Sequence, residues 1–241
     1  MAELLRQIDE LKAELDALRP LRSDSIRSLM TALDVEMVYS SNAIEGNSLT
    51  LRETQLVLEQ GITVSGKPLK DHIEAVNLSH AWNSVKEMAI RSTAITEREL
   101  LDLHLMVLGR DDPHAGHYRS VPVFIRGATH VPPNAAKVST LMADMFATDH
   151  SPLHPVVSAA RWHLGIARVH PFIDGNGRAA RLVMNLCLMR HGFPPLRIQP
   201  SDRLDYYEAL DRCDSDNTSA FELWIAEREK NELAHWLLSL K

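Results

Sequence analysis

Residues 170–181, which read HPFIDGNGRAAR, gather side chains that could bind a polyphosphate. The Asp-Gly-Asn-Gly turn in this stretch lies between two apolar helical segments, so backbone N–H groups are left free at the start of the second helix. Gly175 and Gly177 allow an anion to approach the backbone closely. Arg178 and Arg181 are three residues apart and share one helix face, where guanidinium groups suit phosphate oxygens. The segment therefore predicts an anion site at a helix N-terminus.

Two further residues of this segment could supply the chemistry of a phosphate reaction. Asp174 is a hard oxygen ligand, and Mg²⁺ is typically held by one or two carboxylates together with substrate phosphates. His170 could accept a proton near neutral pH. Each feature alone is commonly structural, as an ordinary turn, a structural histidine or solvated arginines, but here they occur together within twelve residues. A zinc site is a weaker interpretation, because His163 and His170 are seven residues apart and neither cysteine has metal-site spacing.

An acidic helix end upstream, Ser41-Asn-Ala-Ile-Glu45-Gly46, is a second unusual feature. Gly46 is a candidate C′ glycine, so Glu45 lies at a helix C-terminus, which prefers cations. The mismatch costs only about 0.3–1 kcal/mol on a solvated surface. Glu45 is therefore either an exposed acid beside a turn or a residue that faces a strong cation elsewhere in the fold.

Apolar periodicity and capping residues predict a mostly helical chain that positions these groups. The pairs that fit capping boxes are Thr50 with Glu53 and Thr96 with Glu99. The stretch 109–136 holds four prolines, and we expect a long functional loop with a small β-hairpin around Val121–Arg126. Besides a leading helix and one that starts after Thr50, helices are expected at about 25–45, 71–90, 96–108, 135–147, 154–168, 177–190, 202–213 and 217–238.

The leading segment, residues 1–20, has apolar residues at heptad spacing, namely Leu4, Ile8, Leu11, Leu15 and Leu18. Two heptads are too few to predict a coiled coil firmly. The helix could pack on the body of its own chain or pair two copies into a homodimer, and the sequence leaves both open.

The composition is ordinary for a globular protein, with 45% hydrophobic and 24% charged residues among 241. A net charge of −6 argues against broad nucleic-acid binding. Cys187 and Cys213 form no disulfide framework and suit a reducing compartment. No apolar run approaches the length of a membrane span, and the charged start does not read as a signal peptide. We therefore expect a cytoplasmic protein without a membrane partner.

HPFIDGNGRAAR resembles the signature of Fic (Fido-domain) proteins at every fixed position. Two stretches, GHYR (116–119) and VFIRGATHVPP (123–133), resemble the approach to the family's flap and the flap itself. RHGFPPLRI and DYYEAL resemble the family's continuation after the signature helix. SSNAIEGNSLT and GKPLKDHIEAVNLSHA resemble the N-terminal region of members that carry an inhibitory helix. The similarity implies a leading helix (1–20), an N-terminal helical region (25–95) with an inhibitory motif at 41–46, a Fido catalytic core (96–231) and a C-terminal helix end (232–241). The implied fold is a helical Fic core with a small β-hairpin flap and an N-terminal helical extension.

The resemblance implies a nucleotidyltransferase, a protein adenylyltransferase that moves AMP from ATP to a Tyr, Thr or Ser hydroxyl of an unidentified target protein. It assigns His170 as the catalytic base and Asp174 as the ligand of Mg²⁺, with Mn²⁺ as an alternative ion. The remaining ATP-binding residues that it implies are Gly175, Asn176, Gly177, Arg178, Arg181, Tyr206, Tyr207 and Asp214, and the flap residues are Val123, Phe124, Ile125, Arg126 and Gly127. Tyr206 and Tyr207 could equally be ordinary helix residues. Asp214 stands where family members often have an asparagine, and the flap is slightly longer than usual.

Ser41, Glu45 and Gly46 match the family's inhibitory motif, which implies that Glu45 pairs with Arg181 and inhibits in cis. Two alternatives remain open on the sequence. The same site could remove AMP from a modified target or perform another phosphoryl-type transfer, with Glu45 orienting a water. The chain could also be a non-catalytic nucleotide-binding regulator, although an intact His170 counts against that.

Overall fold

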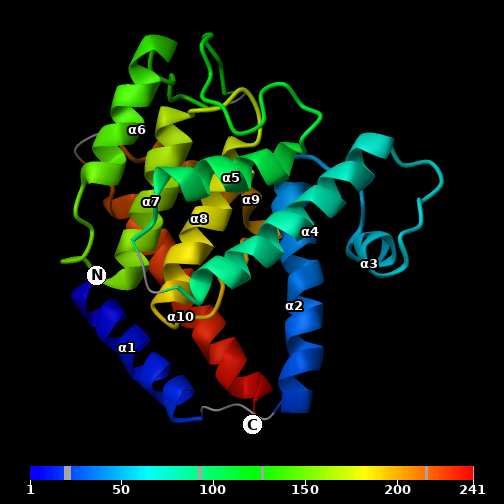
Figure 1. Cartoon of the computed structure of the whole chain (residues 1–241). Coiled ribbons are helices and arrows are strands. Elements are labelled where there is room, and N and C mark those ends of the chain that lie inside the picture. Colours follow the sequence, from blue (N-terminus) through cyan, green and yellow to red (C-terminus); the bar gives the residue numbers. More distant parts are fainter. Residues whose placement is uncertain (19–22, 92–93, 126–127, 215–216, 241) are drawn as a thin grey trace.

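The structure, a computed structural model, describes residues 1–18, 23–91, 94–125, 128–214 and 217–240 (Figure 1). Its helices are α1 (Ala2–Ala17), α2 (Ser23–Ile44), α3 (Leu51–Gln60), α4 (Leu69–Ala89), α5 (Glu97–Leu108), α6 (Val138–Ala147), α7 (Pro155–Val169), α8 (Asn176–Arg190), α9 (Arg203–Asp211) and α10 (Ser219–Ser239), with short 3₁₀ turns at Ala135–Lys137 and Pro200–Asp202. The described part of the chain contains no strand. The predicted mostly helical class is confirmed.

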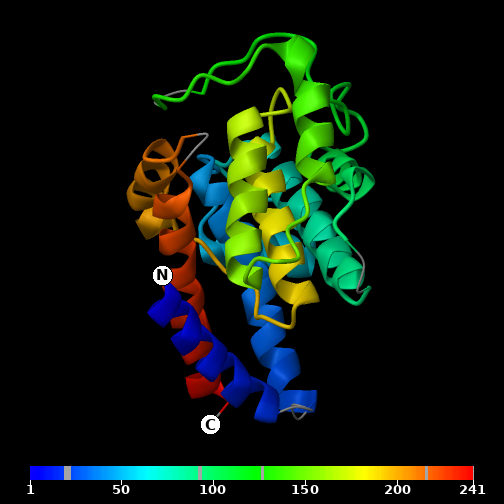
Figure 2. The same cartoon turned by 90° about the vertical axis from the view of Figure 1, so that its left-hand side faces the viewer.

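Two helices joined by the signature turn, α7 and α8, form the centre of the fold (Figures 1 and 2). α8 is buried around its whole circumference, as a helix must be when its neighbours surround it. α4 and α5 cover one side of α8, α7 covers another side, and α2 also contacts α8. This enclosure fixes the N-terminus of α8, and with it the turn that carries the candidate chemistry.

The first helix, α1, packs along the last one, α10, so these two helices lie side by side (Figure 2). Ile8 and Leu15 of α1 are fully buried in this contact region, and Lys230 Nζ donates a hydrogen bond of 2.6 Å to Gln7 Oε1. The heptad-spaced face of α1 is thus used against the chain's own body. The expected division at 231/232 stays a prediction, and α10 is one continuous helix across that position.

Both predicted capping boxes are confirmed. At the start of α3, Thr50 Oγ1 accepts from Glu53 N at 3.3 Å, and Glu53 Oε2 accepts from Thr50 N at 2.7 Å. The same reciprocal pair joins Thr96 and Glu99 at the start of α5. These bonds satisfy N–H groups that have no partner within the helix.

The predicted hairpin is absent from the described part of the loop, which extends as a long arm at one end of the molecule (Figure 2). Residues 121–125 and 128–134 have no strand assignment, and Ala128 N makes only a turn-type bond of 3.3 Å to Ile125 O. Arg126 and Gly127 lie outside the described residues. An isolated two-stranded ribbon is marginal in water, and prolines 122, 132 and 133 remove donors that a strand ladder needs.

None of the helices in the described residues combines the length and apolar character that a bilayer crossing requires. Both cysteines are free and buried.

Candidate active site

His170 lies immediately after α7 in an uncommon backbone conformation. Its φ of 49° and ψ of 59° are left-handed, and no other non-glycine residue in the described chain has a positive φ. Pro171 explains why the right-handed helix stops here, because a residue before proline is disfavoured in the α region. A left-handed residue other than glycine costs roughly 1–2 kcal/mol, so surrounding contacts must hold His170 in place.

The ring of His170 is oriented as a proton acceptor. Its Nδ1 lies 3.2 Å from the carbonyl oxygen of Ala167. A carbonyl can only accept, so Nδ1 carries the hydrogen and Nε2 keeps its lone pair. Burial lowers the pKa of His170 below its ordinary value of 6.5. The charges of Arg119 and His130 lower the pKa further, while the Ala167 carbonyl and Glu45 oppose them.

We therefore expect His170 to titrate below pH 6.5 in the folded protein. If the neutral ring accepts a proton in the reaction, activity should rise with pH through that low pKa and then level off. An NMR titration of the imidazole signals, assigned with His170→Gln, measures the pKa directly. A pKa above 6.5 would contradict the burial argument.

The signature turn is braced by two buried side chains. Asn176 Oδ1 accepts from Phe172 N at 2.9 Å, and Asn176 Nδ2 donates to Phe172 O at 2.9 Å. His104 donates from Nε2 to Asp174 O at 3.0 Å and accepts at Nδ1 from Gly116 N at 2.9 Å. Its ring stacks on Phe172 at 3.6 Å, and burial lowers its pKa to about 4, so it is neutral. Asn176 can therefore contribute only its backbone N–H to an anion.

The N-terminus of α8 is free of any side-chain cap. Its N-cap is Gly175, at φ 76°, where a Cβ would come within 3.3 Å of Leu108 Cδ2 and Val107 Cγ1. The next glycine, Gly177, faces the carboxylate of Glu45, and a Cβ there would lie 2.2 Å from Glu45 Oε1. An uncapped helix start favours an anion. In this structure the carboxylate of Glu45 lies in that position.

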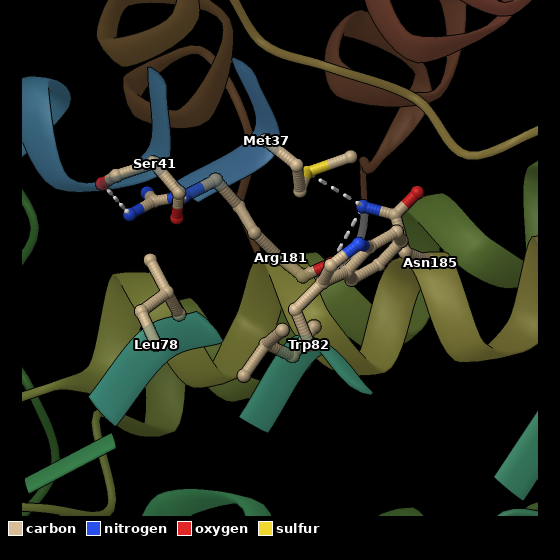
Figure 3. Close-up of a pocket in the computed structure, with 7 residues that line it drawn as sticks. Met37, Ser41, Leu78, Trp82, Arg181 and Asn185 are labelled. Carbon is tan, nitrogen blue, oxygen red and sulfur yellow. Dashed lines mark hydrogen bonds between the residues drawn. The ribbon is translucent and has the colours of Figure 1, made fainter. Parts of the chain in front are cut away.

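Arg181 binds the end of α2. Its Nε donates to Ser41 Oγ at 2.9 Å, and its Nη2 donates to Ser41 O at 2.8 Å (Figure 3). Nη2 also donates to Glu45 Oε1 at 2.8 Å. The Arg181 side chain is 4% exposed and that of Glu45 37% exposed, so the pair is open to solvent on one side. Glu45 thus faces a strong cation, as the second interpretation of the sequence predicted.

The end of α2 places Glu45 accurately. Gly46 has a φ of 97°, its N–H bonds to Ala43 O at 3.0 Å, and Asn47 N bonds to Asn42 O at 3.1 Å. These two bonds form a Schellman motif with glycine at C′, as predicted. Glu45 is the last residue before that glycine, so its side chain leaves the helix at a fixed angle.

The second arginine of the signature has different partners. Arg178 is also 4% exposed, but its Nη1 lies 3.5 Å from Glu74 of α4 and its Nη2 lies 3.5 Å from Asp174. Although the two arginines are on neighbouring turns of α8, they do not converge on one partner in this structure. Glu74 was not a candidate on the sequence, because nothing local connects it to residue 178.

A small cavity lies behind Arg181, between α2, α4 and α8 (Figure 3). Its volume of about 10 Å³ corresponds to roughly one water molecule. The residues around it are Met37, Ser41, Leu78, Trp82, Arg181, Leu182 and Asn185. A nucleotide does not fit in a cavity of this size.

The two aromatic candidates differ in exposure, because Tyr206 is buried and Tyr207 is partly exposed. Tyr206 is 2% exposed. Its hydroxyl forms a hydrogen bond of 3.0 Å with His163 Nε2 and accepts from Arg181 Nη1 at 3.5 Å, so in this structure it contacts the arginine. Tyr207 is 36% exposed, and its hydroxyl donates to Ile44 O at 3.5 Å, at the end of α2. Asp214 accepts from Asn217 N at 2.8 Å in the loop before α10. In the flap, Phe124 is 86% exposed, and Val123 and Ile125 are half-buried.

Asp174 is the candidate metal ligand. Its side chain is 60% exposed, and Oδ1 accepts from Gly175 N at 2.6 Å. Within the described residues, no three His, Cys, Asp or Glu side chains gather as a metal site. One exposed carboxylate beside an anion site fits an Mg²⁺ ion that is held largely by substrate phosphates and water, and does not fit an all-protein site.

Comparison with known proteins identifies relatives of this chain. Residues 94–188 match the Fic/DOC family. The chain is 36% identical over 243 residues to the protein adenylyltransferase Fic of Nematostella vectensis, covering 98% of this chain and 56% of that protein. It thus spans about half the length of the curated relatives it matches.

Solved structures agree with the sequence relatives. A Fic domain-containing signaling protein from Bacteroides thetaiotaomicron superposes with a TM-score of 0.89 at 26% identity, covering 97% of this chain and 96% of that one. Fic-1 (residues 134–508) from C. elegans superposes with a TM-score of 0.86 at 30% identity, covering 99% and 71%. The signature turn, the helices that enclose it and these matches over nearly the whole of this chain lead to one conclusion: the chain belongs to the Fic/DOC family.

Proposed function

We propose that this chain is a protein adenylyltransferase that moves AMP from ATP to a hydroxyl side chain of a target protein and is inhibited at rest by Glu45. The observation that carries the proposal is the juxtaposition of a proton-accepting His170 with an uncapped helix start and a buried arginine. The curated relatives that bear the name protein adenylyltransferase support it.

In the proposed reaction, each residue of the site has a separate role. Nε2 of His170 accepts the proton of the target hydroxyl while that oxygen attacks the α-phosphorus of ATP. The bond from the α-phosphorus to the bridging oxygen breaks, and pyrophosphate leaves. The hydrogen bond from Nδ1 to Ala167 O keeps the imidazolium oriented. Backbone N–H groups of residues 175–177 and the side chains of Arg178 and Arg181 hold the phosphates.

The metal, the nucleoside and the target have separate candidate contacts. Asp174 would hold Mg²⁺ or Mn²⁺, which neutralises phosphate charge when bound. Tyr207 and the region of Asp214 would meet the nucleoside. The flap, residues 123–127, would align the target main chain by strand addition, and exposed Phe124 offers it an apolar contact.

The test uses the Glu45→Gly variant with Mg²⁺, a cell lysate and ATP labelled on the α-phosphate. Label should appear on protein, and ATP labelled on the γ-phosphate should leave none. Label from the γ-phosphate would instead indicate a kinase. No label from either would refute the transferase and favour a binding module.

A second candidate function is the removal of AMP from a modified protein. It is favoured by one observation, that the Glu45 carboxylate is 37% exposed beside the anion site, where it could orient a water. Wild-type protein given an AMP-modified protein as substrate would release AMP, and Glu45→Gly would not.

Asp174→Ala should lower AMP transfer by about 10²-fold, because a phosphate-bound metal contributes several kcal/mol to charge stabilisation. It should also weaken the apparent affinity for Mg²⁺, measured by titrating the ion at fixed ATP in the Glu45→Gly background. Glu10→Ala on α1, an equally exposed acid at 58%, is the control and should change neither value. An unchanged Mg²⁺ affinity in Asp174→Ala would show that other groups hold the ion.

A further inference from the structure

The C-terminal carbonyls of α7 accept hydrogen bonds from residues of the flap loop, which is the stretch 109–134 between α5 and the following 3₁₀ turn. The last carbonyls of a helix have no partner within it. Here Arg168 O accepts from His130 Nε2 at 2.8 Å, and His170 O accepts from Arg119 Nε at 2.8 Å. Val169 O lies 3.4 Å from Arg119 Nη2. The helix that carries the base is therefore capped by the loop that carries the flap.

Arg119 also binds both ends of that loop. Its Nη1 donates to Val121 O at 3.0 Å, and its Nη2 donates to Pro133 O at 2.7 Å. Its backbone N–H donates to Pro171 O at 2.8 Å. The residue is 3% exposed, so these bonds are shielded from water. One buried guanidinium thus connects the start of the flap, the end of the flap and the peptide of His170.

Only arginine can make this set of contacts. Every partner of the side chain is a carbonyl, which only accepts, and guanidinium offers five N–H donors in a fixed planar fork. Lysine keeps the charge but has a single nitrogen, so it cannot reach Val121, Pro133 and His170 together. Because His170 is held in a left-handed conformation, its carbonyl needs a firm partner, and Arg119 Nε is that partner.

We propose that Arg119 is a positioning residue that sets His170 in register with the flap, so that a hydroxyl presented by the flap meets Nε2 of the base. The proposal rests on the adenylyl transfer proposed above. Arg119 acts through His170 and the flap and touches neither nucleotide nor target. The sequence showed Arg119 only as part of GHYR, and its partners lie up to 52 residues away, at Pro171.

The test compares Arg119→Lys and Arg119→Gln in the Glu45→Gly background. Since a misplacement of about 1 Å can cost about 10²-fold, we expect kcat to fall about 10- to 100-fold in both. The KM for ATP should change by no more than about threefold, because the phosphate contacts are intact. The control is Arg190→Lys and Arg190→Gln, since the Arg190 side chain is also only 4% exposed but binds Glu99 at the opposite end of α8 from the signature turn.

The pKa of His170 distinguishes the effect of the Arg119 charge from the effect of its hydrogen-bonding geometry. Three charged or titratable groups act on this ring, namely Arg119, Glu45 and His130. The NMR pKa of His170 should rise in Arg119→Gln, which loses the positive charge, and should stay nearly unchanged in Arg119→Lys. A large loss of kcat in Arg119→Lys without a pKa change would show that the fork, and not the charge, positions the base.

The proposal fails if the Arg119 variants lose no more activity than the Arg190 variants, or if KM for ATP rises in proportion to the loss of kcat. His130→Ala, which removes the outer anchor alone, should give a smaller loss of kcat and supplies a second test if an Arg119 variant does not fold. Hydrogen exchange gives a readout independent of transfer. The amides of His170, of residues 128–131 and of Asn134 should exchange faster in Arg119→Lys and not in Arg190→Lys. Protection unchanged in both would refute the positioning role even if the parent variant transfers no AMP.

Discussion

Replacing His170 by alanine should lower AMP transfer by about 10²–10⁴-fold, the usual contribution of a general base. The base form is secured by the Nδ1 bond to Ala167 O, 3.2 Å, and by burial, which lowers the pKa of the ring. In the reaction that we propose, the histidine acts on the incoming hydroxyl, so ATP binding should be nearly unchanged. Rates would be measured in the Glu45→Gly background, and ATP affinity by calorimetry.

Alanine alone does not isolate the base, because residue 170 has a left-handed backbone. Asparagine tolerates that conformation better than alanine, and its amide can donate to Ala167 O as Nδ1 does. His170→Asn should therefore preserve the turn and still lose transfer to the same extent. If His170→Asn transfers AMP at the parent rate, His170 is not the base, and a low rate in His170→Ala would then reflect a distorted turn.

Local sequence rules predicted the helices well. Both capping boxes, the C′ glycine at Gly46 and the uncapped start of α8 depend on residues within one helical turn of each other, where spacing alone fixes the geometry. The signature turn was likewise recognisable because its chemistry lies in twelve consecutive residues. α1 illustrates the limit of such rules. Its heptad spacing indicated a partner, and only the folded chain showed that the partner is α10.

The site features that sequence reasoning missed are long-range. The contacts that bring these residues to the site join positions far apart in the sequence. They join Arg119 to His170, 51 residues away, His104 to Asp174, 70 residues away, and Glu74 to Arg178, 104 residues away. No local pattern reports such pairs, although a histidine on the apolar face of α5 was a visible oddity. Tyr206 was assigned to the nucleoside by resemblance alone, and its burial between His163 and Arg181 is a property of the packed helices.

The flap shows the opposite difficulty, a local signal that tertiary context did not support. The run VPVFI has strand propensity, but nothing in the described residues pairs with it, and propensity without a partner strand is weak. Strand addition by a target would supply the missing partner. The same segment would then become ordered as a strand only when the substrate protein is bound.

The contact between Glu45 and Arg181, which we propose to be inhibitory, gives the second large effect. Glu45→Gly should raise AMP transfer, because it removes the carboxylate that lies against Gly177 and pairs with Arg181 at 2.8 Å. A charge-assisted bond is worth about 1.5–3 kcal/mol when shielded. Glu45 is 37% exposed, so solvent screening reduces this, and about 1–2 kcal/mol is reasonable. Each 1.4 kcal/mol is a factor of ten, which predicts activation of about 5- to 30-fold.

The reciprocal variant should behave differently, and that asymmetry identifies the mechanism. Arg181→Ala also frees the site from Glu45, but it removes the phosphate partner, so it should stay inactive. The double variant should be inactive for the same reason. Under competition between Glu45 and phosphate, only the carboxylate side of the pair can be removed with a gain. If Glu45 acted only by docking α2, breaking either side of the pair would activate.

Leu33→Ala provides the matched control for loosening of α2. Leu33 is buried on that helix at 5% exposure and is three helical turns away from Glu45, so its loss weakens docking without touching Arg181. Incorporation of labelled AMP would be compared for wild type, Glu45→Gly, Arg181→Ala and Leu33→Ala at the same Mg²⁺ and ATP. Competition predicts that Glu45→Gly alone is strongly activated. Equal activation by Leu33→Ala would mean that release of the helix, and not removal of one carboxylate from the phosphate site, relieves the inhibition.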